Sequence, residues 1–230
     1  MQGIILKIPK SGASWSGGKD SCLALWRSQE TGTSISHLLT ALDETGLKTR
    51  SHGVTRELIM AQGHALGMIN EFISASWQDY EYQFIEKLKY LSSQGISQMI
   101  FGDIDLLAHR EWEEMVCAHA GMKAYLPLWG ENRLAMVHEF LDAGFKAKVV
   151  CVDGQVLNDS FVGREFNHEF ISSLPIGVDA CGENGEFHTF VYDGPNFKSP
   201  VAWKSLGKKT YTSPREYGSK TFYFDLLDIG

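Results

Sequence analysis

Two serines, two glycines, a lysine and an aspartate follow one another near the start of this 230-residue chain, as Ser16-Gly17-Gly18-Lys19-Asp20-Ser21. Glycines let a backbone approach an anion closely, and the hydroxyl groups add hydrogen-bond donors. An apolar helical stretch with Leu23 and Trp26 begins here, and the start of a helix carries a partial positive charge. The segment is therefore a candidate phosphate site.

Two common phosphate-binding patterns do not fit this segment. A Walker A loop needs a glycine five residues before the Gly-Lys pair and a hydroxyl residue after the lysine, where this chain has Ala13 and Asp20. A dinucleotide fingerprint needs spaced glycines, whereas Gly17 and Gly18 are adjacent. The segment instead resembles the S-G-G-x-D-S signature of the PP-loop (N-type) ATP pyrophosphatases. A turn that only caps a helix is the alternative interpretation.

The elements that must position this segment alternate along the first half of the chain. A short strand at 13–15, set apart from the apolar residues 4–8, leads into it. Further strands are predicted at 35–42, 69–77, 98–102 and 123–129, and helices at 20–30, 56–66, 78–93, 110–120 and 132–143. Such alternation predicts a parallel sheet in an α/β fold.

The pattern of apolar and turn-forming residues changes in the second half of the sequence. Strands are predicted at 145–152, 187–192 and 221–227, among turns rich in glycine and proline. We therefore expect a smaller α+β domain after the first one, with residues 1–127 and 128–230 as the two domains.

Composition excludes several classes of protein. A net charge of −7, from 28 acidic and 21 basic residues, argues against a nucleic-acid-binding surface. The four cysteines lie far apart without a C-x-x-C pair, so neither a zinc site nor a disulfide framework is predicted. No run approaches the roughly 20 apolar residues that cross a bilayer, and no secretory signal is evident. We expect a cytoplasmic protein that uses no membrane.

Further motifs follow in order along the chain: FGDID at 101–105, HREW at 109–112, PLWG at 127–130 and DACGENGEFHT at 179–189. With the N-terminal segment they resemble the diphthine–ammonia ligase family of PP-loop ATPases, over residues 15–195. The resemblance implies a HUP-type, Rossmann-like domain followed by a smaller domain that closes over the substrate. It also implies ATP and Mg²⁺ as cofactors, adenylation of a carboxylate with release of pyrophosphate, and amidation by ammonia.

The resemblance also implies roles for individual residues. The nucleotide would be bound by Ser16, Gly17, Gly18, Lys19, Asp20, Ser21, Gly102, Asp103, His109 and Arg110. Lys19 and Asp20 would also be catalytic, and Asp20 and Asp103 would hold the metal. For Asp20, Asp103, His109 and Arg110 the alternative is a structural role at the start of a helix.

The second-half motif supplies the remaining candidates. Glu183 and Glu186 flank the turn dipeptide Asn184-Gly185, which would present both carboxylates to a pocket as catalytic groups. The expected substrate contacts are Arg164, Cys181, Gly182, Glu183, Asn184, Glu186 and His188. The alternatives are exposed turn glutamates, a small buried apolar residue for Cys181, and a surface ion pair for Arg164.

Three hypotheses for the function follow. The first is an ATP-dependent amide ligase that acts on a small-molecule or protein carboxylate, either diphthine on an elongation factor or another acid. The second is a tRNA-modifying PP-loop enzyme, which would call for a basic face and paired cysteines that this chain lacks. The third is a nucleotide-binding sensor without chemistry. The resemblance to the family also suggests a homodimer.

Overall fold

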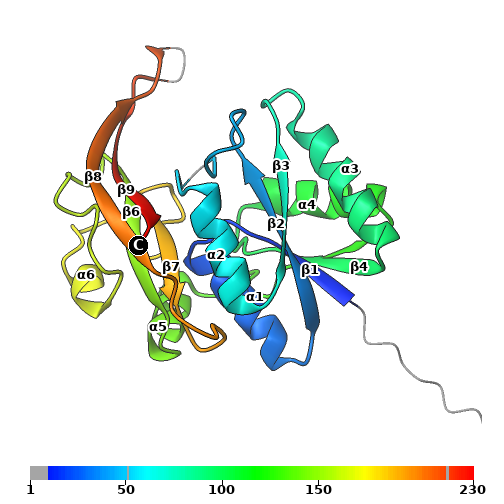
Figure 1. The fold of residues 1–230 in the computed structure, drawn as a ribbon. Coiled ribbons are helices and arrows are strands. Elements are labelled where there is room, and N and C mark those ends of the chain that lie inside the picture. The colour runs from blue at the N-terminus through cyan, green and yellow to red at the C-terminus, as the bar shows by residue number, and fades with distance from the viewer. Residues whose placement is uncertain (1–9, 51, 216–217) are drawn as a thin grey trace, which may run out of the picture.

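The computed structural model describes residues 10–50, 52–215 and 218–230, arranged around two β-sheets that lie side by side (Figure 1). Residues 4–8, the apolar stretch expected ahead of the first strand, lie outside the described residues. Among the residues described, none of the helices combines the length and apolar character that a bilayer crossing requires.

Strands and helices alternate around the first sheet, as the sequence predicts. Its elements are β1 (Lys10–Ser14), α1 (Lys19–Glu30), β2 (Ser34–Leu42), α2 (Arg56–Leu66), β3 (Ile69–Ser74), α3 (Tyr80–Ser93), β4 (Ile96–Ile100), α4 (Leu107–His119) and β5 (Lys123–Tyr125). All neighbouring strands are parallel, in the order β3-β2-β1-β4-β5. The order reverses between β1 and β4, so the carboxyl ends of these strands border the crevice where open α/β sheets bind ligands.

Helices cover both faces of this sheet. Leu25 of α1 and Leu58 of α2 belong to one buried cluster, and Phe84 of α3 belongs to another. Leu38 and Leu39 are consecutive on β2, and they pack into these two different clusters. Because both faces are covered, β2 has consecutive buried residues at 38–40 rather than a strict alternation, and its apolar run could be recognised in the sequence.

The second sheet is antiparallel, in the order β7-β6-β9-β8. Its part of the chain contains α5 (Arg133–Asp142), β6 (Lys146–Asp153), α6 (His168–Ser172), β7 (Phe187–Asp193), β8 (Trp203–Thr212) and β9 (Thr221–Ile229). The outer strand β8 and the short α6 were not predicted. Nearly every residue of β8 is exposed, so the strand lacks an apolar alternation. In Figure 1, β8 and β9 extend past the other strands as a two-stranded arm.

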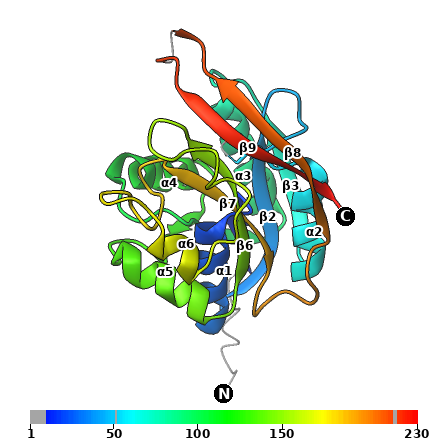
Figure 2. The ribbon, with the colours of Figure 1, turned by 90° about the vertical axis from the view of Figure 1, so that its left-hand side faces the viewer.

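The two sheets share one core. Helix α1 lies against β7 and α2 against β9, and Val149 and Phe190 of the second sheet belong to the same buried cluster as Leu25. Figure 2 views the molecule from the side of the second sheet. The predicted division after residue 127 falls between β5 and α5, and it stays a prediction.

Several element ends differ from the predictions. Strand β1 covers residues 10–14 rather than 13–15, β3 ends at Ser74 rather than 77, β4 covers 96–100 rather than 98–102, and β5 ends at Tyr125 rather than 129. Pro127 lacks the N–H that a continued β5 would need. Trp77 is apolar but exposed, at the edge of a cavity, so its residue type alone misled the strand prediction.

Candidate active site

The predicted phosphate segment forms the turn between β1 and α1. Gly17 has a φ of 78°, a left-handed conformation that other residues rarely adopt. A Cβ atom at Gly18 would collide with Cε1 of His52 and would lie 3.1 Å from the carbonyl oxygen of Thr189. Gly18 also precedes α1 and offers no side chain to cap the helix. The backbone conformation of the turn thus requires glycine at position 17, and the closeness of His52 and Thr189 requires it at position 18.

Elements from both sheets hold this turn in place. The N–H of Val191 on β7 donates to the carbonyl oxygen of Gly17 at 2.9 Å. The buried side chain of Gln62 on α2 donates to the same oxygen at 2.9 Å and to the carbonyl oxygen of Val191 at 2.6 Å. Its Oε1 accepts from the indole N–H of Trp15 at 2.9 Å. The turn is therefore fixed before any ligand arrives.

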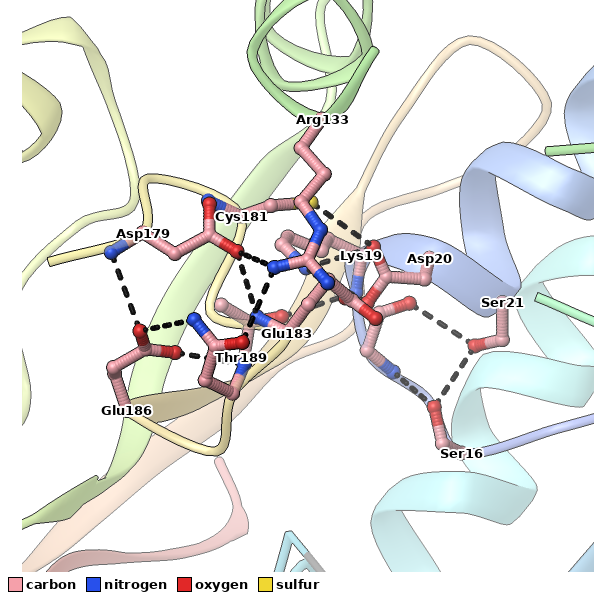
Figure 3. A network of polar contacts seen from close by, with 12 residues as sticks. Ser16, Lys19, Asp20, Ser21, Arg133, Asp179, Cys181, Glu183, Glu186 and Thr189 are labelled. Atoms are coloured by element: carbon pink, nitrogen blue, oxygen red, sulfur yellow. Dashed lines mark hydrogen bonds and ion pairs between the residues drawn. The ribbon is translucent and has the colours of Figure 1, made fainter. Parts of the chain in front are cut away.

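The hydroxyl groups of the turn are linked to one another (Figure 3). Ser16 Oγ lies 3.1 Å from Ser21 Oγ and accepts the N–H of Gly18 at 3.2 Å. Ser21 Oγ donates to the carbonyl oxygen of Gly18 at 3.0 Å. The N–H of Lys19 donates to Thr189 Oγ1 at 3.0 Å. Thr189, on β7, thereby joins the second sheet to the start of α1.

Lys19 is the centre of a buried charge cluster. Its ammonium lies 2.7 Å from both carboxylate oxygens of Asp20 and 3.6 Å from Glu183, and the residue is only 6% exposed. Burial by itself lowers the pKa of Lys19, but the neighbouring negative charges, Asp20 foremost, raise it above its usual value. Burial and then the charge of Asp20 raise the pKa of Glu183 to about 7. A full positive charge is thus held at the turn, beside a carboxyl group that can exchange a proton near neutral pH.

The two predicted glutamates of segment 179–189 have different surroundings. Glu186 is 5% exposed and accepts hydrogen bonds from the N–H of Asp179 at 3.2 Å and from the N–H and side-chain amide of Asn184 at 2.9 Å each. Glu183 instead turns toward Lys19. The expectation that the turn presents both carboxylates to one pocket is therefore corrected: Glu186 holds the turn together, and only Glu183 faces the phosphate segment.

A cavity of about 340 Å³, here called the loop cavity, opens beside the turn. Most of the predicted site residues line it: Ser16, Lys19, Asp20, Ser21, Gly102, Asp103, His109, Gly182, Glu183 and His188. These residues come from the carboxyl ends of β1 and β4 and from segment 179–189. The loop cavity thus lies at the crevice expected from the strand order, and segment 179–189 forms one of its walls.

A second cavity of about 550 Å³, here called the aromatic cavity, adjoins the first. Its walls include Trp15, Trp77, Tyr80, Phe84, Phe101 and Trp112. Tyr80 and Phe84 belong to α3, which the sequence predicts only as a helix at 78–93. Ser16, His52, Asp103 and His109 line both cavities, so the two are continuous. A flat apolar group with a charged tail would fit this combination.

Two polar side chains of the aromatic cavity have buried atoms without hydrogen-bond partners among the described residues. The guanidinium of Arg50 lies 4.5 Å from the ring centre of Trp77 and 5.5 Å from that of Tyr80, and its Nε and Nη2 atoms are buried and unpaired. Oε2 of Glu113, which is 4% exposed, is also unpaired. Burial, above other causes, raises the pKa of Glu113 to about 10, so the group is neutral at pH 7. Buried polar groups without partners are typical of places where a ligand binds.

Two histidines line the loop cavity, and one of them, His52, also lines the aromatic cavity. Nδ1 of His52 lies 2.8 Å from the carbonyl oxygen of Thr189, and the rings of His52 and His188 are 4.7 Å apart. Burial lowers the pKa of His52, and burial followed by the charge of His52 lowers that of His188 to about 3. His52 was missed by sequence reasoning because it lies in the loop between β2 and α2, outside every motif.

The predicted residues after β4 separate into two groups. A Cβ at Gly102 would lie 2.9 Å from backbone atoms of Asp20 and Ser21, so only glycine lets β4 approach α1 this closely. Asp103 lies 2.6 Å from Nδ1 of His109 at the junction of the cavities. Arg110 instead pairs with Glu114 at 2.7 Å and lies over the ring of Trp129, and it lines neither cavity.

Arg164 is likewise not brought to either cavity. Its guanidinium lies over the rings of Phe161 and Phe170 and donates to Ser173 Oγ at 2.8 Å. Cys181 is close to the site but 1% exposed, with Sγ 4.0 Å from Oδ1 of Asp20. Burial raises the pKa of this thiol to about 12, so it is protonated at pH 7.

The side chains at the turn partly fit a magnesium ion. Ligand atoms of Asp20, Cys181 and Glu183 all lie within 4.8 Å of one another. Mg²⁺ prefers oxygen ligands, so the two carboxylates suit it and the thiol does not. Both oxygens of Asp20 already contact Lys19, so a cation must share Asp20 with that ammonium. Asp103, the other predicted ligand, is not part of this group, and its Oδ1 contacts His109.

The sequence matches two family models that together cover most of the chain. The first, described as the diphthamide synthase N-terminal domain, matches residues 9–124. The second, described as the diphthamide synthase C-terminal domain, matches residues 132–217.

Individual relatives agree with these matches. A diphthine–ammonia ligase of Danio rerio is 26% identical over 219 residues, which cover 81% of this chain and 83% of that protein. A diphthine–ammonia ligase of Schizosaccharomyces pombe is 25% identical over 209 residues, which cover 81% of this chain but only 34% of that longer protein. A solved structure described as a predicted subunit of tRNA methyltransferase from Methanocaldococcus jannaschii is 18% identical, with a TM-score of 0.44 over 61% of this chain and 80% of that one.

Proposed function

The chain belongs to the diphthamide synthase family of ATP-dependent ligases, and we propose that it activates a carboxylate with ATP and joins ammonia to it. The observation that carries this proposal is the glycine turn at the start of α1, with the buried ammonium of Lys19 behind it and a cavity in front. A helix start and a fixed positive charge favour the phosphates of ATP.

In the proposed reaction a carboxylate oxygen of the substrate attacks the α-phosphorus of ATP. The bond between the α-phosphorus and the bridging oxygen to the β-phosphate breaks, pyrophosphate leaves, and an acyl-adenylate forms. Ammonia then attacks the acyl carbon, AMP leaves with the electron pair of the carbon–oxygen bond, and the nitrogen loses a proton to give the amide. The protein mainly has to orient the reactants and offset the negative charge on the phosphates.

We assign the phosphates to the loop cavity and the adenosine to the aromatic cavity. Ser16, Ser21 and the backbone of the two glycines would bind the phosphates, with Lys19 opposite the charge that develops on them. Asp20 and Glu183 would hold Mg²⁺, which supplies further charge neutralisation when it is bound. The stacked aromatic walls and the unpaired nitrogens of Arg50 suit a purine base, which offers a flat surface and acceptor atoms.

Two classes of carboxylate substrate are candidates. The relatives are named for diphthine and ammonia, which makes a modified histidine on an elongation factor the first candidate substrate. A different acid, presented by a small molecule, is the second. In either case the protein works in the cytoplasm, and no contact with nucleic acid is needed.

Product analysis by mass spectrometry tests the proposal. The purified chain is incubated with ATP, Mg²⁺ and ammonium, together with either a diphthine-bearing elongation factor or a metabolite extract from the source organism. AMP, pyrophosphate and an amidated product are expected from the wild type and not from a Ser16→Ala, Asp20→Ala variant. Formation of ADP and phosphate alone would refute the adenylation step. If the chain bound nucleotide but formed no product with either substrate source, the hypothesis of a nucleotide-binding sensor without chemistry would be favoured.

The cysteines separate the ligase from a sulfur-transferring tRNA enzyme. Sulfur transfer needs a reactive thiolate, whereas burial raises the pKa of Cys181 to about 12 and that of Cys22 well above its usual value. A Cys22→Ala, Cys181→Ser variant is therefore expected to keep AMP formation within about threefold of the wild type, because sulfur is not required in the ligase reaction. Loss of activity together with retention of tRNA at low salt would support the tRNA-modifying alternative.

A further inference from the structure

The turn that carries Glu183 is held by a residue from outside it. Arg133, the first residue of α5, donates from Nη1 to Oδ2 of Asp179 at 2.6 Å and to the side-chain oxygen of Asn184 at 3.3 Å. Asp179 in turn accepts the N–H of Cys181 at 2.9 Å and that of Glu183 at 3.3 Å. The guanidinium of Arg133 therefore holds the carboxylate of Asp179, and that carboxylate holds the backbone of Glu183.

The other edge of the same guanidinium reaches the first sheet. Nε and Nη2 of Arg133 donate to the two oxygens of Asp105 at 2.7 and 2.8 Å. Asp105 lies in the loop after β4, and its near neighbour Asp103 lines the loop cavity. A bidentate pair of this kind fixes direction as well as distance. Arg133 thus spans the space between the β4–α4 loop and the turn that faces the phosphate segment; Figure 3 shows its contact with that turn.

We propose that Arg133 is a positioning residue, which keeps Glu183 opposite Lys19 by tying the 179–186 turn to the β4–α4 loop. The inference rests on the proposed function, because the charge arrangement at the turn matters only if a reaction takes place there. Arg133 lines neither cavity, so it acts through Asp179 and Asp105 and not on the substrates. Its loss would let Glu183 move relative to the phosphates without removing any group that binds them.

Arg27, on α1, offers a matched control because it contacts the same helix α5. From α1 it donates to Oε1 of Glu139 on α5 at 2.8 Å, forms a second bond to Oε2, and donates to the carbonyl oxygen of Pro127 at 3.0 Å. It therefore also joins α5 to the first sheet through a bidentate pair, but through the opposite part of the helix and without the 179–186 turn. If Arg133 only fastened α5, the loss of either arginine would have the same effect.

The test compares Arg133→Met, Arg133→Lys and Arg27→Met with the wild type, all as the full chain. Steady-state AMP formation is measured with the acyl source that supports wild-type turnover. Arg133→Met is expected to lower kcat by about 10- to 100-fold, with KM for ATP changed by less than about threefold. Arg133→Lys should restore only part of the loss, because one ammonium cannot form both pairs. Arg27→Met should keep kcat within about threefold of the wild type.

Hydrogen exchange at the amides of Cys181 and Glu183 gives a readout that needs no turnover. It should become faster in Arg133→Met and stay unchanged in Arg27→Met. Equal losses of kcat in the two methionine variants, or a loss confined to KM, would overturn the proposal. If Arg133→Met does not fold, Asp105→Asn gives the same comparison by weakening one side of the contact. A wild type that forms no AMP would refute the proposed function instead, while the exchange comparison would still decide whether Arg133 orders the turn.

Discussion

Replacing Lys19 with methionine is expected to lower the rate of AMP formation by about 10²- to 10³-fold, the size of effect typical for loss of a preorganised electrostatic contact. The ammonium lies 2.7 Å from Asp20 and 3.6 Å from Glu183, and its burial strengthens its action on nearby charge. Methionine fills similar space but leaves the two carboxylates facing each other. Because the Lys19 charge lowers the pKa of Glu183, that pKa should rise further in the variant. Phosphates entering the cavity would then lack the ammonium that offsets their charge.

The measurement is release of AMP and pyrophosphate under saturating ATP, with circular dichroism to confirm folding. Lys87→Met is the matched control, because Lys87 forms a half-buried ion pair with Glu71 at 2.9 Å on the far side of the first sheet. It removes the same charge from the chain and should leave the rate unchanged. A Lys19→Met enzyme that works within threefold of the wild type would show that this ammonium does not stabilise the transition state.

Gly102→Ala is expected to weaken both the fold and the binding of ATP. The added Cβ would lie 2.9 Å from backbone atoms at the start of α1, and backbone cannot move aside as a side chain can. The first turn of α1 must therefore shift, and with it Asp20 and Ser21. Overpacking of this kind costs about 1–3 kcal/mol of unfolding free energy. Displacement of the phosphate turn should raise the Kd for ATP by about tenfold, equivalent to about 1.4 kcal/mol.

Urea unfolding and titration with ATP followed by tryptophan fluorescence measure the two effects, because Trp15, Trp77 and Trp112 line the aromatic cavity. Gly12→Ala in β1 is the control. Its Cβ would meet the end of the flexible Met99 side chain at 2.7 Å, which can rotate away. That variant should lose some stability and keep its affinity for ATP. If Gly102→Ala and Gly12→Ala bound ATP with equal affinity, the packing of β4 on α1 would have no effect on ATP binding, and the prediction would be wrong.

The first sheet could be predicted from the sequence because helices cover both of its faces and leave apolar clusters in its strands. One such cluster contains Leu38 and Leu39, and helical stretches separate the clusters. Strand β8 gave no such signal, since nearly all of its side chains face solvent. The predicted end of β3 was wrong because Trp77, an apolar residue, lines a cavity and is not part of the strand. Burial, and not residue type, decides these positions.

The phosphate turn was identifiable because its residues are contiguous in the sequence and include two adjacent glycines. The rest of the site is assembled from distant segments. Nothing in the sequence around Asn184 tells which neighbouring glutamate faces Lys19 and which accepts backbone N–H groups. Arg133 and His52 lie outside the 179–189 motif and reach the site only through tertiary contacts. The arginine in the second half that was expected to bind substrate, Arg164, packs on phenylalanine rings instead.

The outer strand of the second sheet has a consequence for how copies of this protein meet. Among the described residues, no strand pairs with the outer edge of β8, and such an edge is a template on which another chain can add by main-chain pairing. Lys204, Lys208 and Lys209 lie along this strand, and a second copy in the same place would bring its own lysines against them. Repulsion and the cost of dehydrating these ammonium groups oppose the contact. The arm therefore resists edge-to-edge aggregation in concentrated solution, and a homodimer would have to form through a different surface.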